Sequence, residues 1–285
     1  MTGFTKSRSA SVYHGGFLLF ISKSERGVKM GEYKEFITKI NKRFGIDLAL
    51  YKEAQMKRRL TSLRNKRGFK NFATYFDALM KDEDLLEEFF DRITINVSEF
   101  YRNPKRWDVL REKVFPELIK NKQRLKIWSA ACSSGEEPYS LAIMLKEHFS
   151  HVNFSILATD IDERSLRKAQ RGIYNESALK SLPKHKKSKY FIIKDNKYVI
   201  RNELKQYITF QKHDLLKDTY PQEIDLIVCR NVLIYFTDEA KDNIYRRFSE
   251  SLTKNGILFV GSTEQIFHPH EYGLQLYDTF FYQKI

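Results

Sequence analysis

The sequence has only two cysteines, Cys132 and Cys229, which have neither a paired spacing nor a histidine pair nearby. This composition excludes a disulfide framework and indicates no metal site, so we expect a reducing compartment, the cytoplasm. Long apolar runs are also missing. The longest one near the start, residues 15–21, is far shorter than the ~20 residues of a membrane-spanning helix, and no small-residue cleavage site follows it. We therefore expect neither a membrane anchor nor a signal peptide.

Two glycine-rich patterns are absent as well. The chain contains no G-x-G-x-x-G and no Gly-Lys-Ser/Thr, which argues against a dinucleotide fingerprint and a P-loop. Acidic residues are outnumbered, with 36 Asp and Glu against 50 Lys and Arg, a formal net charge of +14. This surplus predicts acidic partners, but it does not choose between nucleic acid, an anionic membrane and an acidic protein surface.

The 285 residues include 42% hydrophobic side chains, enough to bury a core in one small and one larger domain. Residues 1–29 show neither a helical nor a strand period. The stretch just before Met30, residues 25–29, can be encoded by a purine-rich run like a ribosome-binding site. We therefore interpret residues 1–29 as a disordered or mis-started extension and Met30 as the true start.

Residues 30–95 repeat apolar side chains at helical spacing, which predicts a small all-helical domain. One expected helix, residues 52–70, carries eight Lys or Arg against the single acid Glu53. It fits a solvated charged face and, equally, a docking surface for an acidic partner that uses Arg58, Arg59 and Arg67. On this prediction the docking surface and the cofactor site lie on different domains.

After a linker and connecting helix at residues 96–124, short apolar strands alternate with helices through residues 125–285. Strands are expected at residues 125–128, 154–159, 208–210, 224–229 and 257–260, and helices at 138–149, 163–170 and 238–252. This alternation predicts a Rossmann-like α/β fold, a parallel sheet with helices on both faces. Functional residues should follow the strands, because ligands bind beyond their carboxyl ends in such sheets.

One segment breaks the alternation. Residues 190–193 and 198–200 are predicted to form a hairpin, and residues 180–212 hold ten Lys or Arg against Asp195 and Glu203. We interpret residues 184–207 as an inserted antiparallel β subdomain with a basic face.

The first strand leads into the turn SAACSSGEEPYS at residues 129–140. Small residues there allow backbone to approach a ligand, and Pro138 can open the following helix. A diphosphate would need glycine amides and cations, whereas this turn ends in the acids Glu136 and Glu137. Two anions suit the ammonium and sulfonium groups of S-adenosylmethionine, although acids also simply favour a helix N-terminus.

Further polar residues follow the later strands. Asp160 ends the second strand, where an acid accepts hydrogen bonds from ribose hydroxyls, although it also fits an ordinary helix cap. Asp214 could meet an adenine amino group and Leu215 its ring face. His213 is assigned no role, because a lone histidine is more often a core residue.

The fourth strand ends in the run CRNVLIYF, which places Arg230, Asn231 and Tyr235 near the reacting atoms. Tyr235 also fits an ordinary core aromatic. Upstream, residues 96–102 join the two domains and can line the cleft between them, and domain interfaces are favoured ligand sites.

Four runs together resemble the CheR family of chemotaxis receptor methyltransferases, most of all its Bacillus branch. They are TINVSEFYR at 94–102, WSAACSSGEEPYS at 128–140, ATDID at 158–162 and CRNVLIYF at 229–236, and the likeness covers residues 32–285, including GSTE at 261–264. The resemblance implies a protein-glutamate O-methyltransferase that acts on the cytoplasmic helical bundle of chemotaxis receptors. It also implies S-adenosylmethionine contacts at Asn96, Ser98, Arg102, Glu136, Asp160, Asp214, Leu215, Arg230 and Asn231, with Arg102 and Tyr235 beside the methyl group.

Two positions depart from the commoner family pattern. Ser98 stands where many members have Thr, which keeps the hydroxyl, and Asp214 stands where Asn is usual, which leaves an acceptor only. A glutamate carboxylate is already ionised at neutral pH, so the reaction requires no general base.

Two rival functions were weighed. A nucleic-acid methyltransferase usually presents a Pro-Pro-aromatic loop at the fourth strand, and residues 231–234 contain no proline. A binding protein without activity would not need Arg102, Arg230 and Tyr235. We therefore expect a monomeric enzyme without a nucleic-acid partner or membrane insertion.

Overall fold

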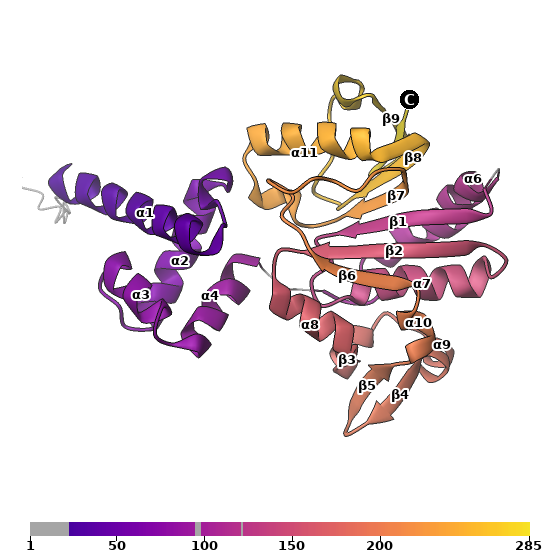
Figure 1. Cartoon of the computed structure of the whole chain (residues 1–285), viewed down its shortest axis with the longest axis horizontal. Coiled ribbons are helices and arrows are strands. Elements are labelled where there is room, and N and C mark those ends of the chain that lie inside the picture. The colour runs from indigo at the N-terminus through magenta and orange to yellow at the C-terminus, as the bar shows by residue number, and fades with distance from the viewer. Residues whose placement is uncertain (1–22, 95–97, 121) are drawn as a thin grey trace, which may run out of the picture.

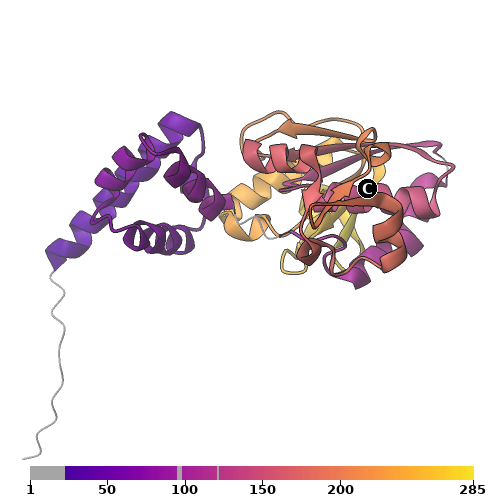
Figure 2. The ribbon, with the colours of Figure 1, turned by 90° about the horizontal axis from the view of Figure 1, so that it is seen from below.

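The computed structural model describes residues 23–94, 98–120 and 122–285. Its N-terminal part is all helical and lies beside the α/β part, as Figures 1 and 2 show from two directions. The helical elements are α1 (Lys23–Phe44), η1 (Leu48–Leu50), α2 (Glu53–Lys66), α3 (Phe72–Leu79) and α4 (Glu83–Thr94). Their apolar faces enclose a separate core that includes Phe36, Ile40, Leu60, Tyr75 and Phe89.

Two helix boundaries differ from those predicted. The helix α1 starts at Lys23, seven residues ahead of Met30, so residues 23–29 are helical. Apolar periodicity does not reveal residues 23–29, because their Lys, Glu and Arg are good helix formers without being apolar. The earlier part of the expected extension lies outside the described residues. The basic helix is shorter than expected, because α2 ends at Lys66 and Gly68 follows with a φ of +80°.

The α/β part contains a seven-stranded sheet in the order β6-β2-β1-β7-β8-β10-β9. The five strands from β6 to β8 are parallel, and β10 and β9 add antiparallel pairings at one edge. The strands are β1 (Arg124–Ala130), β2 (Asn153–Asp160), β6 (Ile208–Lys212), β7 (Ile224–Cys229), β8 (Leu252–Val260), β9 (Leu274–Asp278) and β10 (Phe281–Lys284). The predicted parallel sheet is confirmed, whereas β9 and β10 were not predicted.

Helices cover both faces of this sheet, as the alternation of side chains requires. On β1, Leu125 and Ile127 belong to the core under α7 (Glu136–His148), and Trp128 and Ala130 belong to the core under α11 (Asp238–Ser251). The connecting helix consists of α5 (Pro104–Val109), the π-helical turn η2 (Leu110–Val114) and α6 (Phe115–Ile119). The helix α8 (Glu163–Arg171) follows β2.

The predicted antiparallel insertion is present, and it contains one more strand than expected. β4 (Phe191–Lys194) and β5 (Lys197–Ile200) form the hairpin, and β3 (Ile173–Tyr174), from ahead of residue 184, pairs with β5 on its other side. The helices η3 (Glu176–Leu179), α9 (Lys184–Tyr190) and α10 (Asn202–Lys205) complete it. Figure 1 shows this small sheet below α8, away from the helical domain.

The helical domain is joined to the sheet domain by main-chain hydrogen bonds. The Lys52 N–H donates to the Tyr235 carbonyl (2.9 Å), and the Thr237 N–H donates to the Leu50 carbonyl (2.9 Å). On the opposite side, Arg164 of α8 reaches α4. Its Nη2 donates to the Glu87 carbonyl (2.7 Å), and its Nη1 lies 2.7 Å from Glu87 Oε1. Among the described helices, none is long and apolar enough to span a membrane.

Candidate active site

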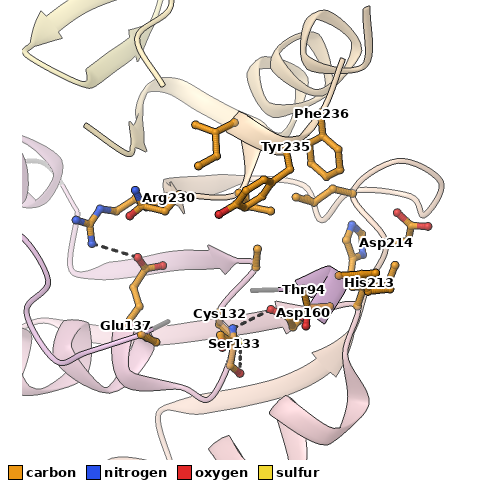
Figure 3. A pocket seen from close by; sticks show the side chains of 18 of the residues that line it. Thr94, Cys132, Ser133, Glu137, Asp160, His213, Asp214, Arg230, Tyr235 and Phe236 are labelled. Atoms are coloured by element: carbon orange, nitrogen blue, oxygen red, sulfur yellow. Dashed lines mark hydrogen bonds and ion pairs between the residues drawn. The ribbon is translucent and has the colours of Figure 1, made fainter. Parts of the chain in front are cut away.

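A cavity of about 280 Å³ lies at the carboxyl ends of β1, β2, β6 and β7, where the fold predicts a ligand. Helical-domain residues Tyr51, Ile93 and Thr94 close one side of it. Figure 3 shows two ends, with Glu137 and Arg230 at one and Asp160, His213 and Asp214 at the other. The two domains therefore enclose this cavity together.

Most of the predicted site residues share this cavity. Those that line it are Ser98, Arg102, Asp160, Asp214, Leu215, Arg230, Asn231 and Tyr235. Asn96 lies outside the described residues. Glu136 does not line the cavity. Its carboxylate accepts hydrogen bonds from the Ser134 hydroxyl (2.8 and 3.0 Å) and is also hydrogen-bonded to the Ser98 side chain, behind the cavity wall. Burial raises the pKa of the Glu136 carboxyl.

The turn after β1 bends sharply through residues with left-handed backbone. Ala131 and Ser133 have φ angles of +62° and +50°, and Gly135 has +93°. A Cβ on Gly135 would lie 2.8 Å from the Ala169 Cβ and 3.1 Å from the Tyr174 hydroxyl. Only glycine tolerates this close approach to α8, which keeps the turn open beside the cavity.

Asp160 is held rigidly at the end of β2. Its Oδ2 accepts a hydrogen bond from the Ser133 N–H (2.8 Å) and its Oδ1 accepts one from the Asp162 N–H (3.0 Å). Burial raises the pKa of the Asp160 carboxyl to about 6, although these N–H donors oppose the shift. A buried carboxylate with free lone pairs favours a ligand that brings hydroxyl donors, as ribose does.

The neighbouring end of the cavity combines an acid with apolar surface. Asp214 Oδ1 accepts the Leu216 N–H (2.8 Å), and burial raises the pKa of the Asp214 carboxyl. Leu215 is buried beside it. The His213 ring packs edge-on against Trp128 with the centroids 5.3 Å apart, and burial lowers the pKa of its imidazole. His213 therefore combines a core position with one face toward the cavity.

The opposite end holds a buried ion pair that the sequence did not reveal. Glu137 Oε2 lies 3.4 Å from Arg230 Nη1, and Glu137 Oε1 accepts a hydrogen bond from the Ser129 hydroxyl (2.8 Å). Their side chains are 14% and 3% exposed. Burial raises the pKa of the Glu137 carboxyl, and Arg230 opposes that shift. Glu137, rather than Glu136, is thus the acid of this turn that reaches the cavity.

Arg230 also fixes the loop that carries Arg102. Its Nη2 donates to the Arg102 carbonyl (2.8 Å) and to Asn103 Oδ1 (3.2 Å), and the Trp107 indole donates to the same carbonyl (2.9 Å). Tyr101 and Asn103 have φ angles of +53° and +61°, a strained backbone that orients the residue between them. Arg230 was predicted as a cofactor contact, and these hydrogen bonds direct its guanidinium mainly toward protein.

Tyr235 projects from η4 (Leu233–Tyr235) into the space between the two ends (Figure 3). The Arg59 guanidinium lies over its ring, 5.2 Å from the centre. Arg59 was predicted to lie on a docking surface of another domain, apart from the cofactor site. That separation is wrong for Arg59, because the main-chain pairing of the domains brings α2 against η4.

The other two predicted docking cations differ in their surroundings. Arg58 is exposed, whereas the Arg67 Nε lies 2.5 Å from Glu88 Oε2, and Lys66 approaches the same carboxylate at 3.3 Å. The charge of α2 is therefore partly neutralised by α4. Across the described ranges, no group of three or more His, Cys, Asp or Glu is placed to hold a metal ion.

The charged groups that line the cavity fit S-adenosylmethionine better than a phosphate ligand. Four acidic residues line the cavity, and one of them, Glu99, is paired with Lys180 (2.7 Å). The other three, Asp160, Asp214 and Glu137, lie at its two ends and suit hydroxyl, amino and sulfonium groups. Burial disfavours each of these charges, so a ligand that supplies donors or positive charge would stabilise them.

Comparison with known proteins agrees with this fit. Residues 96–279 match the family model of the CheR methyltransferase S-adenosylmethionine-binding domain, and residues 31–94 match the CheR methyltransferase all-alpha domain. A chemotaxis protein methyltransferase of Listeria innocua is 46% identical over 254 residues, 89% of this chain and 97% of the relative. One of Borreliella burgdorferi is 39% identical over 249 residues, 82% of this chain and 88% of the relative.

A solved structure of PKMT2 from Rickettsia typhi with AdoHcy has a TM-score of 0.32 and 16% identity. The match covers 48% of this chain and 21% of that one, which is too little to carry an argument. The family models and the curated relatives extend over both domains and both ends of the cavity. On these grounds the chain belongs to the CheR methyltransferase family, and it is an enzyme that uses S-adenosylmethionine.

Proposed function

We propose that the chain transfers a methyl group from S-adenosylmethionine to glutamate side chains of chemotaxis receptors, giving glutamate methyl esters and S-adenosylhomocysteine. One observation carries the proposal. Arg102 and Tyr235 line the cavity together with the acids, and a second cation, Arg59, lies over the Tyr235 ring. This arrangement provides for a carboxylate substrate directly beside a cofactor site. The names of the curated relatives agree with it.

The chemistry asks little of the protein beyond placement. S-adenosylmethionine supplies an activated methyl group, whose C–S bond breaks as a C–O bond to the carboxylate forms. A glutamate side chain has an ordinary pKa of about 4.3, so it is already the nucleophile at neutral pH. In-line placement of oxygen, carbon and sulfur can supply on the order of 7 to 11 kcal/mol of the barrier.

Each cavity residue has a proposed task. Arg102 grips the incoming carboxylate, and Tyr235, oriented by Arg59, positions its second oxygen or packs against the methyl group. Asp160 accepts the ribose hydroxyls, and Asp214 with Leu215 holds the adenine. Asn96, Ser98, Arg230 and Asn231 complete the proposed cofactor contacts. Glu136 would act from behind the wall through Ser98, and we propose Glu137, which lines the cavity, as the acid for the ammonium end.

The proposed receptor surface is α2. Arg58 is free of acidic neighbours on its own turn and exposed, so it can steer an acidic helical bundle toward the cavity mouth. Arg59 and Arg67 are included with it, although Arg67 must share its charge with Glu88. We further propose that the enzyme acts as a monomer in the cytoplasm.

The deciding experiment uses S-adenosylmethionine with a radiolabelled methyl group and receptor-containing membranes. We expect label on the receptor that base releases as methanol, because esters hydrolyse in base and N-methyl groups persist. The matched control is a receptor whose methylation-region glutamates are changed to Ala. Base-stable label, or label on added nucleic acid instead of receptor, would refute the proposal.

A further inference from the structure

Glu264 has a buried carboxylate that lies outside the cavity and is hydrogen-bonded to the loop of residues 231–234. The side chain follows β8, and the residue is 4% exposed. Its Oε2 accepts hydrogen bonds from the N–H groups of Asn231 (2.6 Å) and Gly261 (2.7 Å). Its Oε1 accepts those of Leu233 (2.7 Å) and Ile234 (3.3 Å). One carboxylate thus satisfies four main-chain donors, three of them in the loop that ends at Tyr235.

The loop needs such a partner because its backbone leaves the sheet abruptly. Asn231 has a φ of +61°, and the N–H groups of Asn231, Leu233 and Ile234 donate to the Glu264 side chain instead of to a neighbouring strand. Unpaired buried N–H groups are costly, and hydrogen bonds to a charged acceptor are stronger than neutral ones. The shape of the loop therefore depends on the carboxylate of Glu264.

Gly261 shows how closely the two segments fit. A Cβ at this position would lie 2.3 Å from Glu264 Oε2 and 2.8 Å from the Asn231 nitrogen. No side chain can be added there without displacing the carboxylate or the loop. The approach of residues 261–264 to residues 231–234 is therefore built into the backbone.

We infer that Glu264 is a positioning residue for methyl transfer, which acts through the loop of residues 231–235 to set the places of Asn231 and Tyr235. The inference depends on the proposed function for the tasks of those two residues. Glu264 itself touches neither substrate nor cofactor. Its contribution should appear as turnover, with little effect on how strongly the receptor binds to α2.

The test compares Glu264→Gln with Asp225→Asn. Asp225 is also 4% exposed and accepts a main-chain hydrogen bond, from Lys126 (2.9 Å), but it lies at the far end of β7. Both changes replace a buried carboxylate by an amide. In Glu264→Gln the new NH₂ group faces N–H donors, so we expect kcat per folded molecule to fall at least tenfold with receptor KM within twofold of the parent. Asp225→Asn should lose stability and keep the parent kcat.

A second readout does not need the receptor. Hydrogen exchange of the amides of Asn231, Leu233 and Ile234 should speed up at least tenfold in Glu264→Gln and stay unchanged in Asp225→Asn. If the parent enzyme methylates no glutamate, the proposed function fails. The inference is then still tested by amide exchange and by S-adenosylhomocysteine affinity, each compared between Glu264→Gln and the parent. Parent-like exchange in Glu264→Gln, or a parent-like kcat despite faster exchange, would overturn it.

Two further variants guard against a failure to fold. Glu264→Asp keeps the charge on a shorter side chain, so it should recover part of the turnover that Glu264→Gln loses. Gly261→Ala keeps the carboxylate but pushes it away from the loop, so its kinetic defect should match that of Glu264→Gln. Full activity of folded Gly261→Ala would also overturn the inference.

Discussion

Burial at the cavity wall raises the pKa of the Asp160 carboxyl to about 6. Because this value lies above that of an unfolded Asp, the folded protein holds the proton more tightly. Stability should therefore decline as the pH rises from about 4 to 6 and stay level above that range. Ligand hydroxyls that donate to the ionised form reverse the preference, so binding and ionisation of Asp160 are linked.

The first prediction follows from this linkage. Affinity for S-adenosylmethionine should fall as the pH drops below about 6, approaching tenfold per pH unit, because binding then requires the loss of a proton. Asp160→Ala should weaken binding and leave the fold intact, and Asp160→Asn should remove most of the pH dependence. Calorimetry from pH 5 to 7.5 measures both effects. Unchanged affinity of folded Asp160→Ala would exclude Asp160 as the ribose acceptor.

The second prediction concerns Arg102, whose main-chain carbonyl is held by a hydrogen bond from Arg230. Arg102→Ala should lower the methylation rate about 100-fold, because small misplacements of a reacting group cost that much. Its receptor affinity should change far less. Arg102→Lys is the control, since it keeps the charge and loses the planar fork. Receptor methylation at the parent rate by Arg102→Ala would contradict the proposed role.

At the scale of elements, α2 combines two different surfaces. Arg59 contacts Tyr235, and Arg67 is paired with Glu88 of α4, so Arg58 offers the cleaner test of steering. A reversal of all three cations would mix docking, catalysis and domain stability. The variants should be made singly.

The third prediction is that Arg58→Glu slows receptor methylation several-fold at low salt and much less at high salt, because exposed charges act mainly on encounter. Cofactor affinity should not change. Arg59→Glu should lower kcat at both salt concentrations, since it removes the contact with Tyr235. Initial rates at two ionic strengths measure these effects. Equal rates of Arg58→Glu and the parent at low salt would show that this face is only solvated.

The sequence predicted the strands whose ends build the site, because a buried strand such as β7 is an apolar run interrupted only by Asp225 and is followed by the polar Arg230. It missed β9 and β10, because their sequences, LQLYD and FYQK, are short and mix apolar with polar residues, which is a weaker pattern. The turn offered both Glu136 and Glu137, and the family resemblance implied Glu136, whereas Glu137 lines the cavity. The choice depends on which acid faces the cavity, and sequence order alone does not settle a rotation of one helical position.

At the scale of the whole molecule, the two domains enclose the cavity and meet on two sides of it. One side is main-chain pairing around Tyr235, and the other is the contact of Arg164 with Glu87 and Asp91. Local sequence patterns do not predict these contacts, because they join residues more than 70 positions apart. For the same reason the proximity of Arg59 and Tyr235 could not be read from the sequence.

The fourth prediction concerns exit of the product. A ligand between two domains leaves more readily when the domains separate, so Arg164→Gln should raise the dissociation rate of S-adenosylhomocysteine several-fold. Arg167→Gln is the matched control, since Arg167 lies on the same helix and pairs with Glu163 of that helix (3.8 Å). Stopped-flow displacement measures both rates. Equal rates for the two variants would show that Arg164 does not restrain opening.

The pairing of residues 50–52 with residues 235–237 has a further consequence. It anchors the start of α2 beside Tyr235, so Arg58 lies a fixed number of helical turns from Tyr235. A rigid helix advances about 1.5 Å per residue, so on the proposed function α2 would set a fixed distance along the receptor helix. Glutamates would be chosen by their spacing from a neighbouring acid along the receptor helix, and a receptor could gain or lose a methylation site by shifting that acid one turn.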